Sequence, residues 1–138
     1  MPGLATRLHS VAIHLLRRVR TEDAAARIGP ARLSALSVLV FGGARTLGEL
    51  AAAEQVRPPT MTRIVAALEA EGLVAREADA RDRRVARVRA TEAGVQLMLE
   101  ARDRRVARLE SLVGELTPAE RAALEEGVSA LERALRRG

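Results

Sequence analysis

Arg81, Asp82, Arg83 and Arg84 are consecutive in this sequence and form a cluster of side chains suited to binding a polyanion. A guanidinium group donates hydrogen bonds in a fixed plane, which suits bidentate contacts with phosphates and insertion into a narrow DNA groove. Asp82 lies two residues before Arg84, so its carboxylate can hold that guanidinium in one rotamer and reduce the entropy lost on binding. An ordinary solvated turn with surface ion pairs is the alternative interpretation.

A second group of candidate contacts follows two consecutive prolines, which prevent the preceding helix from continuing and predict a new helix from about Pro59. The apolar residues of that helix have the spacing of one buried stripe: Met61, Ile64, Val65 and Leu68. This leaves Thr60, Thr62 and Arg63 exposed at the first turn, although simple helix capping would also explain the threonines. The helix N-terminus favours a phosphate, and Arg63 is the best candidate for a guanine contact. We expect Arg57, before the helix, to contact phosphate.

The elements around these two groups follow the order of a winged helix-turn-helix. An earlier helix opens at Thr46, where Thr46 and Glu49 have the spacing of a capping box. The helix from about Pro59 follows, and Gly72 is placed to end it. Leu73–Val74 leads into one strand and residues 85–90 form a second, which predicts a hairpin whose turn carries the arginine cluster. This order predicts one helix in the major groove of duplex DNA and an arginine-rich wing beside it.

Three segments resemble the MarR/SlyA-type winged-helix transcription regulators: V-R-P-P-T-M-T-R-I-V-A-A-L-E-A-E-G-L-V, D-A-R-D-R-R-V and A-T-E-A-G. The resemblance covers nearly the whole chain and implies DNA contacts at Pro59, Thr60 and Arg63. It also implies that Asp82 orients Arg84 for entry into the minor groove. Arg81 and Arg83 would supplement this contact on phosphates, whereas Arg87 and Arg89 suit phosphate contact and plain solvation equally well.

Helices with narrow apolar seams are predicted at both ends of the chain. In the first helix, about Leu4 to Arg20, the seam contains Leu4, Leu8, Val11, Leu15 and Val19. In the last helix, where Thr117 and Glu120 have the spacing of a capping box, it contains Leu124, Val128, Leu131 and Leu135. Such seams are hard to bury in one small protomer, and the resemblance implies an intertwined homodimer on an inverted-repeat operator. We expect a repressor; the alternative is an unusually helical monomer.

The predicted fold is therefore mainly α with a small β-hairpin wing. Residues 1–29 form an N-terminal dimerisation helix and a polar connection from Thr21 to Gly29. Residues 30–92 form the winged helix-turn-helix domain, which starts with a helix from Pro30 to about Gly42. Residues 93–138 are assigned to two C-terminal dimerisation helices. Thr91, just before this region, caps the first of them, which continues to about Glu115.

The resemblance implies a site for a small aromatic or amphipathic anion where the dimerisation helices meet the winged domain. We expect such a ligand to release the DNA. The first, second and fifth helices would wall this site and offer His9, His14, Arg17, Arg18 and Phe41. The two histidines are about 140° apart around a helix, so they do not share a face as zinc ligands would. No metal or other cofactor is predicted.

The amino-acid composition excludes several other classes of function. The chain has 138 residues, a formal net charge of +5 and one aromatic residue, Phe41, so it lacks a stacking platform for single-stranded bases. The absence of cysteine excludes disulfides and thiol-based sensing. The sequence has no signal pattern or membrane-length apolar run, which predicts a cytoplasmic protein, and no arrangement of catalytic residues. A winged domain used only for protein contacts is the main alternative, but it would not need the arginine cluster.

Overall fold

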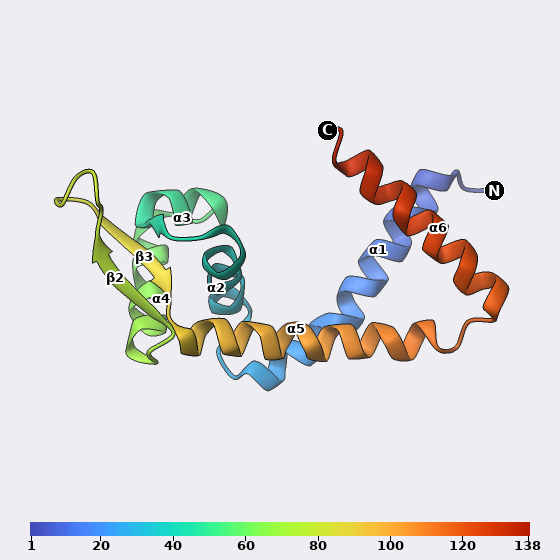
Figure 1. The fold of residues 1–138 in the computed structure, drawn as a ribbon, viewed down its shortest axis with the longest axis horizontal. Helices are drawn as coiled ribbons and strands as arrows, with labels where there is room; N and C mark the ends of the chain where they lie inside the picture. The colour runs from blue at the N-terminus through green and yellow to red at the C-terminus, as the bar shows by residue number, and fades with distance from the viewer. The chain divides into compact units, whose positions relative to one another are not determined.

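The computed structural model describes residues 1–138, which divide into two compact units, 1–105 and 106–138. Along the chain (Figure 1) the elements are α1 (Leu4–Arg20), the 3-10 helix η1 (Thr21–Ala26), α2 (Pro30–Gly42), β1 (Arg45–Thr46), α3 (Leu47–Ala53), α4 (Pro58–Ala70), β2 (Val74–Ala78), β3 (Ala86–Ala90), α5 (Glu92–Val113) and α6 (Pro118–Leu135). The predicted fold class, mainly α with a small β-hairpin, is confirmed.

A hydrophobic core in the first unit holds α4 against α2 and α3. Met61, Val65 and Leu68 are fully buried, and Ile64 packs at the edge of the core, as the apolar spacing predicts. Burial of each such side chain stabilises the fold by about 1.5–3 kcal/mol. Because this stripe faces inward, the side chains on the other side of the first turn of α4 remain in solvent.

A three-stranded antiparallel sheet with the order β1-β3-β2 follows α4 along the chain. β2 and β3 pair from Val74–Ala90 to Ala78–Ala86 and form the predicted hairpin. β1, which sequence analysis did not predict, adds two residue pairs to the other edge of β3. Val88 is fully buried at the centre of β3 and connects the sheet to the core.

The end of α4, the start of β2 and the first turn of α5 meet at Leu73. Gly72 adopts the left-handed conformation (φ +73°), and Leu73 N–H donates to the Leu68 carbonyl at 2.9 Å, as in a helix C-cap. The Leu73 carbonyl accepts the Thr91 N–H at 3.0 Å, and the Thr91 hydroxyl accepts the Gly94 N–H at 3.2 Å. A Cβ on Gly94 would overlap the Leu73 carbonyl oxygen, so only glycine permits this close approach.

Three predicted boundaries need correction. The expected polar connection at 21–29 contains η1, because Ala26 and Ile28 are buried and draw this segment onto the core. α4 begins at Pro58 rather than Pro59, with Arg57 as its N-cap residue, since proline suits the first helical position. α5 ends at Val113, slightly before the predicted Glu115.

The predicted capping boxes at the starts of α3 and α6 are both present. In α6, Glu120 N–H donates to the Thr117 hydroxyl at 3.3 Å, and Thr117 N–H donates to the Glu120 carboxylate at 2.9 Å. The seam of α6 is exposed along its length: Leu124, Val128, Leu131 and Leu135. α1 likewise exposes Leu4, Leu8, Val11 and Leu16, whereas the predicted seam residues Leu15 and Val19 are half-buried.

No single helix is long and apolar enough to cross a lipid bilayer, and the one bent pair that meets this test by length and composition joins residues 4–26 to α2. The α2 half of that pair supplies Leu33, Leu36 and Leu39 to the core described above, and core helices commonly meet the same criterion.

Replacing Gly94 with Ala should lower the free energy of unfolding by about 1–3 kcal/mol, the usual cost of overpacking. The added methyl group would overlap the Leu73 carbonyl and lie 3.2 Å from Leu36 Cδ1. Urea unfolding followed by far-UV circular dichroism measures the effect. Gly48→Ala is the control, because a Cβ there has Thr46 Oγ1 as its nearest neighbour at 4.0 Å. Equal stabilities of the two variants would contradict the close approach at Leu73.

Candidate nucleic-acid interface

The first turn of α4 presents a solvent-exposed group of side chains. Arg57, Pro59, Thr60, Thr62 and Arg63 are exposed, whereas the stripe between and behind them is buried. The two prolines fix φ for a helix start but carry no N–H group. This end of α4 therefore offers fewer backbone donors to a phosphate than we expected from the sequence, so side chains must supply most of the contacts.

The polar side chains of this turn differ in how freely they can donate. The Thr62 hydroxyl donates to the Pro58 carbonyl at 3.0 Å, so it can offer a ligand only its acceptor lone pairs without rearrangement. Arg63 takes part in none of the protein's ion pairs, and its five donors remain available. Arg63 is consequently the stronger candidate for base recognition.

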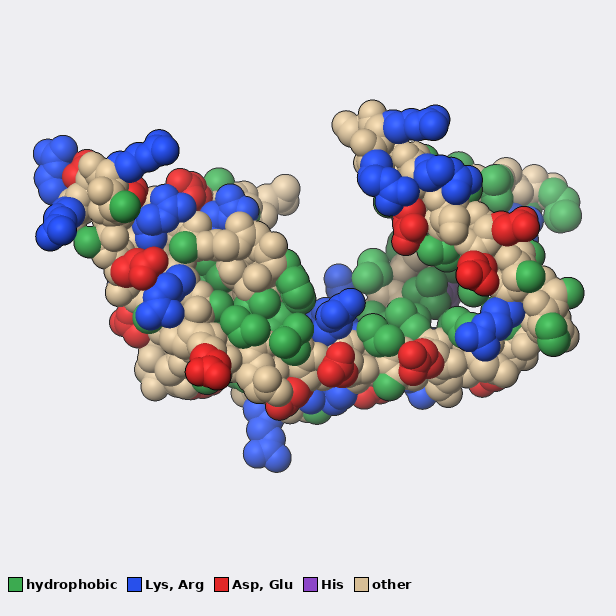
Figure 2. All heavy atoms as spheres, viewed as in Figure 1, with side chains coloured by type: hydrophobic (Ala, Val, Ile, Leu, Met, Phe, Trp, Pro, Cys, Tyr) green, Lys and Arg blue, Asp and Glu red, His purple; other side chains and the backbone are tan.

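Two aspartates order the turn between β2 and β3, which we call the wing tip (residues 79–85). Asp79 accepts the Arg81 N–H on its carboxylate at 3.0 Å and donates its own N–H to the Val85 carbonyl at 2.9 Å. Asp82 accepts the Arg84 N–H at 3.1 Å in the same manner. These side-chain bonds are the local turns that aspartate favours, and they leave the intervening arginines pointing into solvent. Figure 2 shows basic side chains gathered at this end of the unit.

Asp82 also binds the guanidinium group of Arg84. Arg84 Nε lies 3.1 Å from Asp82 Oδ1 and Arg84 Nη2 lies 3.3 Å from Asp82 Oδ2, so the contact is bidentate. The hydrogen bonds from the Arg84 side chain, and then from its backbone, lower the pKa of Asp82 below its usual value. The Arg84 side chain is nonetheless 91% exposed. An exposed guanidinium is thus held in one orientation, as the two-residue spacing predicts.

Arg87 and Arg89, which the sequence leaves open between phosphate contact and solvation, each have a partner within the protein. Arg89 Nε lies 3.1 Å from Glu77 Oε2 on the neighbouring strand. Arg87 Nη2 donates to the Ala44 carbonyl at 2.9 Å, and its side chain is only 32% exposed. Arg81 and Arg83 remain exposed at the wing tip.

The residues predicted for a ligand site do not converge. His14, Arg17 and Arg18 are exposed on α1, where His14 Nδ1 lies 2.7 Å from the Ser10 carbonyl oxygen. Phe41 is 61% exposed near the end of α2. None of these four residues lines the cavity between α1 and α2 or the shallow pocket on α6.

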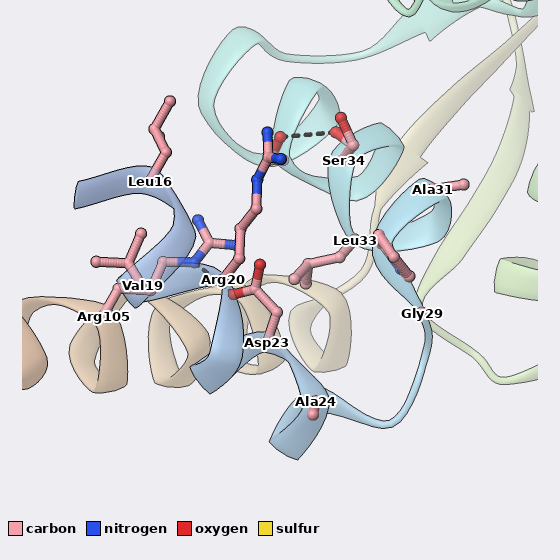
Figure 3. A pocket seen from close by; sticks show the side chains of 12 residues that line it. Leu16, Val19, Arg20, Asp23, Ala24, Gly29, Ala31, Leu33, Ser34 and Arg105 are labelled. Atoms are coloured by element: carbon pink, nitrogen blue, oxygen red, sulfur yellow. Dashed lines mark hydrogen bonds and ion pairs between the residues drawn. The ribbon is translucent and has the colours of Figure 1, made fainter. Parts of the chain in front are cut away.

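A cavity of about 890 Å³ is lined by residues of α1, α2 and α5, the three helices predicted to wall a ligand site (Figure 3). Residues of η1 also line it. Its apolar wall includes Leu16, Val19 and Leu33, and its charged groups are Arg20, Asp23 and Arg105. Arg105 Nε lies 2.6 Å from Asp23 Oδ1. The Arg20 side chain extends toward α2. An apolar wall with two guanidinium groups suits an amphipathic anion.

The cavity lies on a different face of α1 from the predicted residues His14, Arg17 and Arg18. Leu16, Val19 and Arg20 have the three- and four-residue spacing of one helix face, which continues to Asp23 in η1. That spacing was available in the sequence. The partner Arg105 was not, since the two members of the ion pair are 82 residues apart.

An exposed helix N-terminus after a tight turn, together with a small sheet and a basic hairpin, defines this chain as a winged helix-turn-helix protein. The sequence model of the MarR family matches residues 30–86. An HTH-type transcriptional regulator of Mycobacterium bovis is 34% identical over 121 residues, covering 88% of this chain and 85% of the relative. The chain belongs to the MarR family of transcriptional regulators; these relatives are regulators rather than enzymes.

Solved structures show the same fold. The transcriptional regulator Tm0710 of Thermotoga maritima has a TM-score of 0.86 at 24% identity, covering 96% of this chain and 94% of that one. A MarR family protein of Bacillus stearothermophilus has a TM-score of 0.77 at 28% identity, covering 96% and 93%. The likeness extends over nearly the whole of each chain.

Replacing Arg84 with Ala should raise the pKa of Asp82 toward its usual value, because the larger of the two hydrogen-bond contributions is lost. The folded-state pKa of Asp82 is lowered, so the pair's contribution to stability is present above the unfolded pKa and is lost as pH falls through the folded pKa. The pair is therefore intact at neutral pH. Carboxyl-carbon NMR titration measures the shift, with Arg83→Ala as the control. The same Asp82 titration in both variants would contradict the pairing.

Proposed function

We propose that this regulator is a cytoplasmic homodimeric repressor that binds an inverted repeat in double-stranded DNA. The first turn of α4 enters the major groove and the wing tip enters the adjacent minor groove. The observation that carries this proposal is the Asp82–Arg84 pair, in which an exposed guanidinium is fixed before any ligand arrives. Part of the conformational entropy that the Arg84 side chain would lose on entering a DNA groove is therefore already lost in the free protein.

A relative supports the choice of ligand. A variant of Staphylococcus aureus MepR, solved bound to an oligodeoxyribonucleotide, has a TM-score of 0.73 with this structure at 18% identity. The net charge of +5 also suits a phosphate backbone.

On α4, Thr60 and Arg63 contact base edges, and Pro59 packs against the DNA backbone. Arg57 and Thr62 contact the backbone, where Thr62 accepts rather than donates because its hydrogen is already bound to the Pro58 carbonyl. In the wing, Arg84 enters the minor groove, Asp82 orients it, and Arg81 and Arg83 contact phosphates. In these assignments Thr60 and Arg63 recognise the base sequence, and the remaining residues position the protein on the DNA.

Two copies of the chain associate through the exposed apolar residues of α1 and α6. Leucine and valine seams of this kind are stabilised by burial against partner helices. A two-fold dimer places two α4 helices about 34–36 Å apart, one turn of DNA, which requires an inverted repeat.

An amphipathic anion binds in the cavity lined by Leu16, Val19 and Arg20 and releases the DNA. We place the site there rather than at His14, Arg17, Arg18 and Phe41, since none of those lines the cavity. The ligand's anionic group competes with Asp23 for Arg105. Release requires only that the ligand bind the DNA-free form more tightly than the DNA-bound form.

Affinity for duplex DNA should fall steeply with salt, by about 10³-fold or more between roughly 50 and 200 mM, if six or more phosphates are neutralised. Fluorescence anisotropy with a labelled duplex measures this dependence. Arg84→Ala and Arg63→Ala should each weaken binding by about 1–3 kcal/mol, whereas Arg7→Ala, an exposed α1 arginine outside the interface, is the charge-matched control. No binding to duplex at low salt would favour a winged module that contacts only proteins.

Introducing a charge into the α6 seam should dissociate the dimer. Leu131→Glu places a carboxylate in the apolar surface that the partner covers, and an unpaired buried charge costs several kcal/mol. Sedimentation velocity should show a shift toward monomer. Ala130→Glu is the control, because it adds the same charge next to the seam. A monomeric unsubstituted protein would contradict the dimer directly.

A further inference from the structure

We propose that Arg87 is a positioning residue that anchors the wing to the turn between α2 and β1 and so places Arg84 for its minor-groove contact. The inference rests on the proposed DNA binding and adds a residue that does not itself touch the DNA. It assigns a role to an arginine that neither the sequence motif nor the exposed cluster includes.

The contacts of Arg87 join three segments. Arg87 is in β3, the central strand, where it pairs with Thr46 of β1 on one side and with Glu77 of β2 on the other. Its Nη2 donates to the Ala44 carbonyl at 2.9 Å. Its Nη1 lies 3.8 Å from Asp79 Oδ2, an ion pair longer than a hydrogen bond. One planar guanidinium thus spans the α2–β1 turn and the base of the wing tip.

Burial distinguishes Arg87 from the other wing arginines. The side chains of Arg87 and Asp79 are 32% and 20% exposed, whereas that of Arg84 is 91% exposed. Electrostatic attraction between partners is stronger where less water screens it, so this contact contributes more than a fully exposed pair. The half-buried guanidinium is committed to the protein and is not presented to a ligand.

The outer half of the wing needs such an anchor because Val74 and Val88, at the end near the helices, are buried in the core, whereas the strand residues nearest the wing tip are exposed. Hairpins of two strands are marginally stable alone, and only two residue pairs join β3 to β1. The α2–β1 turn is a suitable anchor point, since Arg45 also donates to it, from Nη2 to the Gly42 carbonyl at 3.3 Å. Arginines from β1 and β3 therefore hold the same turn.

Asp79 connects the anchor to the wing tip. One of its carboxylate oxygens faces Arg87, and the other accepts the Arg81 N–H at 3.0 Å. The orientation of the turn that carries Arg84 is thereby linked to the position of Arg87. A change at Arg87 should reach Arg84 through this turn, without altering the Asp82–Arg84 pair itself.

The test compares Arg87→Gln with Arg89→Gln in duplex binding. Both substitutions remove one positive charge from the same strand, and the ion pair of Arg89 is with Glu77 across the hairpin rather than with Asp79 of the wing tip. Arg87→Gln should weaken binding about tenfold, comparable to losing the Arg84 contact, and Arg89→Gln no more than about threefold. Thermal unfolding of both variants checks that each remains folded at the assay temperature.

Non-additivity is the readout that a merely structural or charge effect would not produce. If Arg87 acts through Arg84, adding Arg87→Gln to Arg84→Ala should weaken binding by less than about twofold more. Independent effects would multiply instead. Full multiplication of the two losses, or equal losses for Arg87→Gln and Arg89→Gln, would overturn the proposal.

Asp79→Asn provides a test in which positioning and net charge predict opposite signs. The asparagine oxygen can still accept the Arg81 N–H, but the amide cannot pair with Arg87. Removing a negative charge should by itself strengthen DNA binding, whereas loss of the link should weaken it about threefold. Tighter binding by this variant would contradict the role of Asp79.

A measurement without DNA separates this inference from the proposed function. Backbone NMR order parameters of residues 79–85 should fall in Arg87→Gln and stay unchanged in Arg89→Gln. If the unsubstituted protein bound no duplex, the proposed function would fail while the order parameters still decided whether Arg87 anchors the wing. Equal order parameters in the two variants would overturn the anchor.

Discussion

The close approach of two backbones at Leu73 and Gly94 is the constraint on which the rest of the first unit depends. The backbone of Leu73 caps α4 through its N–H and receives the Thr91 N–H on its carbonyl, while Gly94 has no Cβ and packs directly against that carbonyl. One residue therefore ends the helix proposed to read DNA, precedes the first strand of the wing and contacts the first turn of α5. Because these three elements share a junction, the inward stripe of α4 is held against α2 and α3, and the first turn of α4 remains exposed.

Aspartates determine what the arginines of this chain can do. Basic residues are too numerous, 23 against 18 acids, for their number alone to identify an interface. Asp82 fixes Arg84 while leaving it exposed, Asp79 helps to hold Arg87 half-buried, and Asp23 pairs with Arg105 at the cavity. Arginine side chains thus have three roles in this chain: an exposed contact for a ligand, an internal anchor, or part of a ligand site. The position of the nearest carboxylate distinguishes the three. An account based on net charge would treat them as equivalent.

Local signals were predictable from the sequence, and signals that depend on distant partners were not. The capping boxes at Thr46 and Thr117 and the α4 stripe were predicted correctly because the interacting residues lie within a few positions of each other. β1 is too short for a periodic signal, and the cavity depends on an ion pair spanning 82 residues. The sequence Arg-Asp-Arg-Arg-Val-Ala-Arg shows the limit directly: at 81–87 it forms the wing tip and enters β3, and at 102–108 it is continuous helix. Flanking residues and tertiary packing decide between the two conformations.

The central claim is that the fold presents two copies of one DNA-reading surface at a fixed separation. Selection of bound duplexes from a random pool tests it most directly, because the enriched sequences report DNA binding, dimer symmetry and spacing together. The account predicts an inverted repeat whose half-sites are centred about 10 base pairs apart. Enrichment of a single asymmetric half-site, of direct repeats, or of no sequence at all would contradict it.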